Sequence, residues 1–308
     1  MLLVYAGLFE YVSKKSAENL GHRLEKFELP AQRLNTLGEQ CWHWITASWT
    51  MVNPWTWEKV LNPYNVNLWS LPAEFRSSIV LFIVVLGLAR LKTCYRLLAL
   101  SCVIWNAAVY HKWEVSATLA GMILAELDSS QGTDKATKTK SNGTIGHRAR
   151  ELSFFLVALY LASYPDLNGE RTPGYRTLSH MIPAHLDRVK CWQTIGCMMV
   201  VHSVNHSSFI QKLFAGPLIQ YLGEISYSVY IVHGPILHSV GVLAISYCWK
   251  HAGRSSLTQK YVSFALAAFT VTPVLFYAAH CFKKLVDVPC GRFTRWLEVY
   301  LTSVGTGK

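Results

Sequence analysis

Residues 73–91 read AEFRSSIVLFIVVLGLARL, and after Arg76 this stretch carries no charge until Arg90. A helix that spans a bilayer needs about 20 predominantly apolar residues, so the stretch is long enough to cross a membrane. Further apolar stretches follow at residues 97–110, 113–127, 151–164, 191–209, 225–249 and 261–282. Several of them reach spanning length only when flanking polar residues are counted. The pattern predicts an all-α, multi-pass transmembrane helical bundle of about seven helices, forming one domain.

The composition agrees with a membrane protein. Of 308 residues, 51% are hydrophobic and only 15% are charged, whereas a soluble domain averages about 25% charged residues. The net charge of +11 comes from basic residues that lie mainly between apolar runs, so we expect no nucleic-acid partner and instead expect a lipid bilayer. Alternate loops differ in Lys and Arg content, which predicts that the loop between Asp128 and Arg150 and the C-terminal tail are cytosolic. The endoplasmic reticulum is the default membrane.

Tryptophan is concentrated in one segment, because six of the 11 Trp lie between Trp42 and Trp69. Indole rings favour the membrane interface, where both the apolar ring and the N–H group are accommodated. Pro54 and Pro63 exclude one continuous helix. We therefore expect an interfacial or re-entrant segment on the non-cytosolic side, with the wall of a substrate cavity as the alternative.

The first polar motif, at residues 68–76, reads LWSLPAEFR. Glu74 would lie in the first turn of a helix, where the helix dipole favours a carboxylate and Arg76 could neutralise it. An ionisable group at the membrane boundary is costly and usually functional. The alternative role for Glu74 is therefore to orient a base or a substrate hydroxyl.

The second polar motif, at residues 221–235, reads YLGEISYSVYIVHGP. Ser226, Tyr230 and His233 are spaced i, i+4, i+7 and share one helix face, which should look into the bundle. Pro235 removes an N–H group and should free the carbonyl of Ile231 near His233. An interhelical hydrogen-bond cluster and a catalytic site are both compatible with this pattern.

Other motifs are weaker. His202 and His206 have the i, i+4 spacing of two metal ligands, but no carboxylate or Cys stands at a supporting position in the sequence, so we expect no metal. The eight Cys include no CxxC pair, which disfavours a zinc site or a disulfide framework. The chain contains no GxSxG, P-loop or GxGxxG motif, which argues against serine hydrolases, P-loop ATPases and dinucleotide enzymes.

These two motifs resemble those of the acyltransferase-3 family of multi-pass membrane O-acyltransferases, in particular its fungal members. The family's first motif is matched by Trp69, Ser70, Leu71, Pro72, Glu74 and Phe75, and its second by Ser226, Tyr227, Tyr230, Ile231, His233 and Pro235. Softer agreement lies at residues 119–127, 172–175 and 286–289. The resemblance covers roughly residue 40 to the end of the chain.

The resemblance implies transfer of an acyl group, typically acetyl, from acyl-CoA as co-substrate to a hydroxyl of a small molecule, in fungi often a secondary metabolite. It implies no bound cofactor. Glu74 would be the orienting carboxylate, and His233 a polar partner or surrogate base. Arg76 and Tyr230 would be supporting donors. The expected substrate-binding residues are Trp69, Arg76, Ser226, Tyr227 and Tyr230.

The family's usual base is a His at the end of its first membrane helix, preceded by an Arg-containing motif. The sequence from Met1 to Gln40 contains neither, so we expect a chain truncated at its N-terminus that lacks the family's first helices. A non-catalytic relative is therefore one alternative. Another is a transporter or permease of a small metabolite, for which helices broken at Pro235 and Pro273 would be suited.

Overall fold

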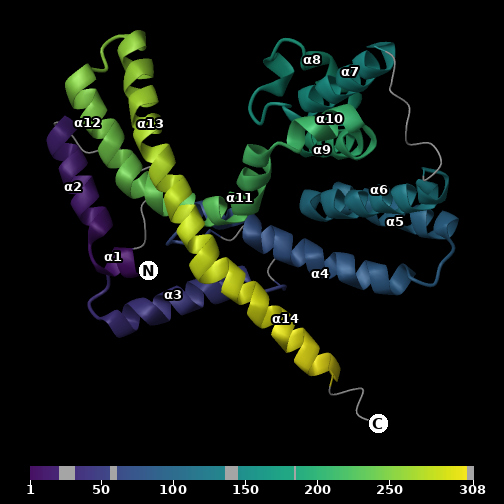
Figure 1. The fold of residues 1–308 in the computed structure, drawn as a ribbon, viewed down its shortest axis with the longest axis horizontal. Helices are drawn as coiled ribbons and strands as arrows, with labels where there is room; N and C mark the ends of the chain where they lie inside the picture. Colours follow the sequence, from purple (N-terminus) through teal and green to yellow (C-terminus); the bar gives the residue numbers. More distant parts are fainter. Residues whose placement is uncertain (21–31, 56–60, 136–144, 184, 304–308) are drawn as a thin grey trace. The chain divides into compact units, whose positions relative to one another are not determined.

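The computed structural model describes residues 1–20, 32–55, 61–135, 145–183 and 185–303 (Figure 1). These residues form α-helices joined by short 3₁₀ and π turns, and no β-strand occurs among them. The predicted all-α fold class is therefore confirmed. The chain divides into two compact units, each described by itself: Met1–Pro72 with Pro217–Lys308, and Ala73–Gly216.

The first unit contains the N-terminal and C-terminal helices. In Figure 1, α12 lies between α2 and α13, and α11 also packs on α13. The helix α3 begins with a capping box formed by Thr36 and Glu39, and α13 with one formed by Ser256 and Gln259. The elements are α1 (Leu2–Tyr5), α2 (Leu8–Leu20), α3 (Leu37–Met51), the 3₁₀ turn η1 (Val66–Trp69), α11 (Pro217–Ile236), the π-turn η3 (Leu237–Gly241), α12 (Val242–Ala252), α13 (Leu257–Phe282), the π-turn η4 (Lys283–Asp287) and α14 (Val288–Ser303).

The second unit holds two apolar cores. Leu100 and Leu119 are fully buried between α5 and α6, with side chains of α4 packed against them. Trp192 packs with Leu161 and Tyr164 between α7 and α9. The elements are α4 (Ser70–Leu88, which begins in the first unit), α5 (Thr93–Val109), α6 (Trp113–Lys135), α7 (Ile145–Ala162), the 3₁₀ turn η2 (Gly169–Arg171), α8 (Arg176–Met181), α9 (Arg188–His206) and α10 (Ser208–Phe214).

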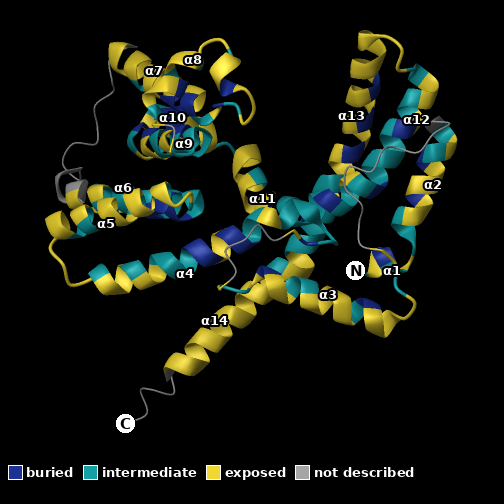
Figure 2. Ribbon diagram, turned by 180° about the vertical axis from the view of Figure 1, so that it is seen from behind, coloured by how far each residue is buried: buried dark blue, intermediate teal, exposed yellow. Residues whose placement is uncertain are grey.

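All seven predicted apolar stretches are helical. Among the described residues, three helical segments are long and apolar enough to cross a membrane: Val66–Leu88, Pro217–Ala252 and Leu257–Thr302; α5 is a shorter apolar helix. Large apolar side chains such as Phe82 on α4 and Phe264 and Phe269 on α13 are exposed, and Figure 2 shows exposed residues along both helices. Exposed apolar surface of this kind is what a lipid environment would cover.

Two details of the sequence prediction are wrong. Much of the predicted loop between Asp128 and Arg150 is helical, because α6 continues to Lys135 and α7 begins at Ile145; residues 136–144 lie outside the described residues. The helix α13 runs through Pro273 without a break. A helix that packs in a bundle tolerates a proline because neighbouring groups can satisfy the backbone carbonyl that it frees.

The tryptophan-rich segment is not one helix, as Pro54 and Pro63 predicted. The helix α3 ends at Met51, and the next helical turn among the described residues is η1. Trp42, Trp49 and Trp55 are all strongly exposed, which favours the interfacial role over the wall of an enclosed cavity. Trp57 lies outside the described residues.

The closest approach between α7 and α9 generates a stability prediction. A Cβ atom on Gly196 would overlap the backbone of Ala162, so Gly196→Ala should push the two helices apart. We expect it to lower the free energy of unfolding by about 1–3 kcal/mol, measured by thermal unfolding of the chain in detergent.

Gly121→Ala in α6 is the matched control, because the added methyl group meets nothing within 4 Å. Alanine favours a helix interior over glycine by up to about 1 kcal/mol, so this variant should be neutral or more stable. An equal loss of stability in both variants would contradict the packing argument.

Candidate functional site

The start of the first polar motif meets the second polar motif in the first unit, where η1 and the residues around it contact α11. Pro235 lies inside α11 and has no N–H group for the carbonyl of Ile231, its partner at position i−4. The side-chain amide of Asn65 donates to that carbonyl at 3.1 Å. The prediction of a freed carbonyl near His233 is thus confirmed, and its new donor comes from a segment far away in the sequence.

Gly234 allows this approach. It is buried, and a Cβ atom there would overlap the side-chain oxygen of Asn65 and press on the amide of Asn67. The same Asn65 oxygen is itself buried without a hydrogen-bond partner in the described structure. An unsatisfied buried acceptor costs about 1–3 kcal/mol, so a hydroxyl that reached it would be bound favourably.

Tyr230 connects α11 to the first motif. Its hydroxyl donates to the carbonyl of Asn67 at 2.8 Å and lies 2.8 Å from the hydroxyl of Ser70, the first residue of α4. A phenol has one proton, and a carbonyl can only accept. The Ser70 hydroxyl must therefore donate to Tyr230, which fixes the direction of both hydrogen bonds.

His233 is held in one orientation by its own helix. Its Nδ1 atom lies 2.6 Å from the carbonyl oxygen of Tyr230, and since that oxygen only accepts, Nδ1 must carry the proton. In the neutral imidazole, Nε2 then keeps the lone pair. His233 is half-buried, with its ring 5.7 Å from that of Tyr230. The ring is thus in the tautomer that can accept a proton at Nε2.

A polar network anchors the segment that carries Asn65. Gln40 of α3 is fully buried, and its side-chain amide donates to the hydroxyl of Tyr64 at 2.8 Å. His43 Nδ1 also lies 2.8 Å from that hydroxyl. The side-chain oxygen of Asn62 accepts from the backbone N–H of Tyr64 at 2.8 Å. These bonds hold the backbone just before Asn65 against α3.

Three further predicted site residues of this unit are Ser226, Tyr227 and Trp69. Ser226 is exposed and donates to the carbonyl of Gly223, one turn back in α11, and Tyr227 is exposed. Trp69 is partly exposed at the end of η1, beside Ser70. Of the three residues predicted to share a face, Tyr230 and His233 are therefore linked through the Tyr230 backbone, whereas Ser226 donates within its own helical turn.

Glu74 and Arg76 belong to the second unit and are described with it alone. Both lie on α4, where Glu74 is exposed and Arg76 is only 4% exposed. A nearly buried guanidinium is costly unless nearby groups compensate its charge. This burial distinguishes Arg76 from the loop arginines of the chain.

Sequence reasoning missed Asn65 and Asn67, although a signal for them was present. Pro235 implied a carbonyl in need of a donor, and the amide side chains just before the first motif are suitable donors. The pairing of Asn65 with Ile231 across 166 positions of sequence depends on tertiary packing, which no local pattern encodes.

The second unit contains a group of possible metal ligands. The side chains of Asp128, His202 and His206 each offer one ligand atom, and these atoms all lie within 4.8 Å of one another. No carboxylate stands at a supporting position beside the two histidines in the sequence. The packing of α6 against α9 supplies one, because it brings Asp128 from 74 or more positions away.

Comparison with known proteins identifies the class. Residues 34–281 match the model of the acyltransferase-3 family, described as "Acyltransferase domain". Because the match covers most of the chain, the chain belongs to this family of acyltransferases. The softer pattern at residues 286–289 lies outside the match.

Particular relatives come from fungi. The chain is 27% identical over 244 residues to the O-acetyltransferase PaAT-1 of Phomopsis amygdali, covering 76% of this chain and 49% of the relative. It is 24% identical over 237 residues both to the acyltransferase clz18 of Cochliobolus lunatus and to the acyltransferase R4 of a Phoma species, covering 74% of this chain and 50% and 51% of those relatives. The chain thus spans about half the length of these curated relatives. No solved structure matches it.

The close approach at Gly234 generates a second prediction. Gly234→Ala should displace Asn65 from the Ile231 carbonyl, because the new methyl group takes the place of the Asn65 side-chain oxygen. We expect a loss of about 1–3 kcal/mol of unfolding free energy, measured by denaturation of the detergent-solubilised chain.

Gly223→Ala on the same helix is the control, because its methyl group meets nothing within 4 Å. If Gly234→Ala proved as stable as Gly223→Ala, the contact between Asn65 and α11 would not support the site.

Proposed function

We propose that this protein is a membrane O-acyltransferase that transfers an acyl group, acetyl from acetyl-CoA, to a hydroxyl of a small hydroxylated metabolite. Membership of the acyltransferase family supports the reaction class. One relative is named an O-acetyltransferase, which supports acetyl as the acyl group and a hydroxyl oxygen as the acceptor. The fungal origin of the relatives supports a secondary metabolite as the acceptor molecule.

The reaction needs a base and a site for a developing oxyanion. The acceptor hydroxyl loses its proton as its oxygen attacks the thioester carbonyl, the carbon–sulfur bond breaks, and the CoA thiolate leaves and takes up a proton. His233 is our candidate for the base. The observation that carries this assignment is the hydrogen bond from Nδ1 to the Tyr230 carbonyl, because it leaves Nε2 as the proton acceptor.

We assign Tyr230 by its contacts and the other residues by the resemblance of their motifs to those of the family. The Tyr230 proton is committed to the Asn67 carbonyl, so Tyr230 holds η1 against α11 and positions His233 through its backbone carbonyl. The resemblance of its motif makes Glu74 the candidate for the orienting carboxylate. Arg76 is a donor to the developing oxyanion, and Trp69, Ser226 and Tyr227 are candidates for binding the acceptor.

The bilayer is the proposed environment, with the endoplasmic reticulum as the default membrane. The three helical segments that could cross a membrane support the membrane location. The charge of the loops supports a cytosolic placement for residues 128–150 and for the C-terminal tail.

The site assignment predicts that His233→Ala and Glu74→Gln each reduce acyl transfer by at least about 100-fold, because positioned general bases contribute about 10²–10⁴-fold. The measurement follows labelled acetyl-CoA into ester products, with membranes that contain the chain and an extract of hydroxylated metabolites.

His180→Ala is the control, because this exposed histidine lies on α8, outside the proposed site. Full activity in both site variants would remove the assignment of His233 and Glu74 while leaving the reaction class intact. No labelled ester from the unaltered chain would contradict the proposed activity itself.

The topology is tested at Asn142, which begins an Asn-Gly-Thr glycosylation sequon and lies outside the described residues. Glycosylation occurs only in the lumen, so a cytosolic Asn142 should carry no glycan. An electrophoretic shift that is removed by glycosidase, and is absent in Asn142→Gln, would reverse the proposed orientation.

A further inference from the structure

The second unit brings three metal-binding side chains together, outside the proposed acyl-transfer site. Asp128 comes from α6, and His202 and His206 are one turn apart on α9. The Nε2 atom of His206 lies 3.2 Å from the Asp128 carboxylate. The two imidazole rings are stacked, with their centres 4.1 Å apart. Asp128 and His206 are partly buried and His202 is exposed, so an ion could enter from solvent.

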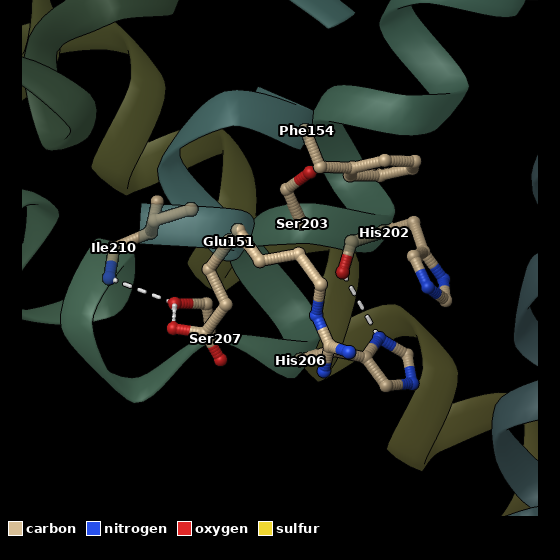
Figure 3. A pocket seen from close by; sticks show the side chains of 8 residues that line it. Glu151, Phe154, His202, Ser203, His206, Ser207 and Ile210 are labelled. Atoms are coloured by element: carbon tan, nitrogen blue, oxygen red, sulfur yellow. Dashed lines mark hydrogen bonds between the residues drawn. The ribbon is translucent and has the colours of Figure 1, made fainter. Parts of the chain in front are cut away.

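The tautomer of His206 determines what can lie between its Nε2 atom and the Asp128 carboxylate. Its Nδ1 atom lies 2.9 Å from the carbonyl oxygen of His202, so Nδ1 carries the proton and donates it (Figure 3). In the neutral ring, the Nε2 lone pair then faces a carboxylate oxygen at 3.2 Å. Two acceptors at that distance repel each other, so either a proton or a metal cation must lie between them.

The presence of His202 as a third possible ligand favours a metal cation over a proton. A protonated His206 is neutralised by Asp128 alone, so it makes no use of the lone pair of His202. A metal uses all three donors, since two imidazole nitrogens and one carboxylate form a common ligand set for Zn²⁺. With bonds of about 2.0–2.2 Å, tetrahedral ligand atoms lie about 3.4 Å apart. The 3.2 Å between His206 and Asp128 is close to that value.

The surroundings orient the ligands. The second carboxylate oxygen of Asp128 accepts from the side-chain amide of Asn205 at 3.4 Å, which leaves the first oxygen toward His206. The His202 carbonyl orients His206 in the same way. Outer contacts of this kind hold metal ligands in place in known sites.

A cavity lies beside the two histidines. It has a volume of about 250 Å³, and Figure 3 shows that Phe154, Ser203 and Ser207 line it together with His202 and His206. Three protein ligands leave the fourth tetrahedral position of Zn²⁺ open for water or another ligand. The cavity offers room for that ligand.

We propose that Asp128, His202 and His206 bind one divalent transition-metal ion of the zinc class, which ties α6 to α9 and keeps one coordination position open. The ion joins two helices that lie on either side of residues 136–144 in the chain. Its role is distinct from acyl transfer, and the proposal stands whether or not the chain is an active transferase.

The test uses the whole chain in detergent, stripped of metal with a chelator. Titration with Zn²⁺ against a chromophoric competitor should give one tight site per chain, and Co²⁺ should give the visible absorption of a low-symmetry, four-coordinate ion. His202→Ala, His206→Ala and Asp128→Asn should each weaken Zn²⁺ binding by at least about 100-fold, since even outer contacts are worth about 10–100-fold.

His147→Ala is the matched control. His147 lies 3.2 Å from Glu151, which reproduces the distance between His206 and Asp128 without belonging to the group of three donors, so this variant should bind Zn²⁺ as tightly as the unaltered chain. Asp128→His keeps three ligands and should keep the site while changing the Co²⁺ spectrum, which separates loss of a ligand from loss of the fold.

The proposal is overturned if the unaltered chain binds no Zn²⁺ stoichiometrically. It is equally overturned if His147→Ala weakens binding as much as His206→Ala does. In either case, the contact between His206 and Asp128 is an ordinary ion pair of a protonated imidazole.

Discussion

The join between the segment around η1 and α11 depends on a single backbone carbonyl, that of Ile231. Pro235 cannot donate to it within α11, and a carbonyl left without a donor in an apolar environment is costly. The amide of Asn65 supplies the missing donor, and the absence of a side chain on Gly234 lets it approach. The backbone around η1 is therefore fixed on α11, and this contact brings Ser70 and Tyr230 together. One missing N–H group thus determines which two distant motifs become neighbours.

How much of the structure could be predicted from the sequence depends on how far apart in the sequence the interacting residues lie. Apolar stretches such as residues 73–91 and 261–282 predicted helices correctly, because helix formation depends on neighbours three and four residues apart. The consequence of Pro235 was also local, so the freed carbonyl could be predicted. Its donor could not, since nothing near Asn65 in the sequence refers to α11. The role of Glu74 could be predicted only from resemblance to a family, and it stays a prediction.

Histidines that look alike in sequence acquire different chemistry through their hydrogen bonds. His233 and His206 both donate from Nδ1 to a carbonyl on their own helix, so each presents Nε2 as the acceptor. The group that faces Nε2 then determines which chemistry each histidine can perform. For His206 it is a carboxylate, which requires a cation, whereas the backbone contact of His233 leaves a base suited to a substrate proton. Spacing along the helix could suggest a pair of metal ligands and a catalytic face, but it could not decide between uses, because the carboxylate that faces His206 comes from another helix.

The π-turn η3 between α11 and α12 has a geometric consequence of its own. A π-turn accommodates one residue more than an α-helical turn, and each residue of an α-helix advances the side-chain direction by about 100°. The side chains of α12 are therefore out of phase with those of α11 by about that angle, although the two helices follow each other directly. The stripe of residues that includes Tyr230 and His233 does not continue into α12. A helical wheel drawn through residues 217–252 as one helix would assign the wrong residues to the face that packs on α2.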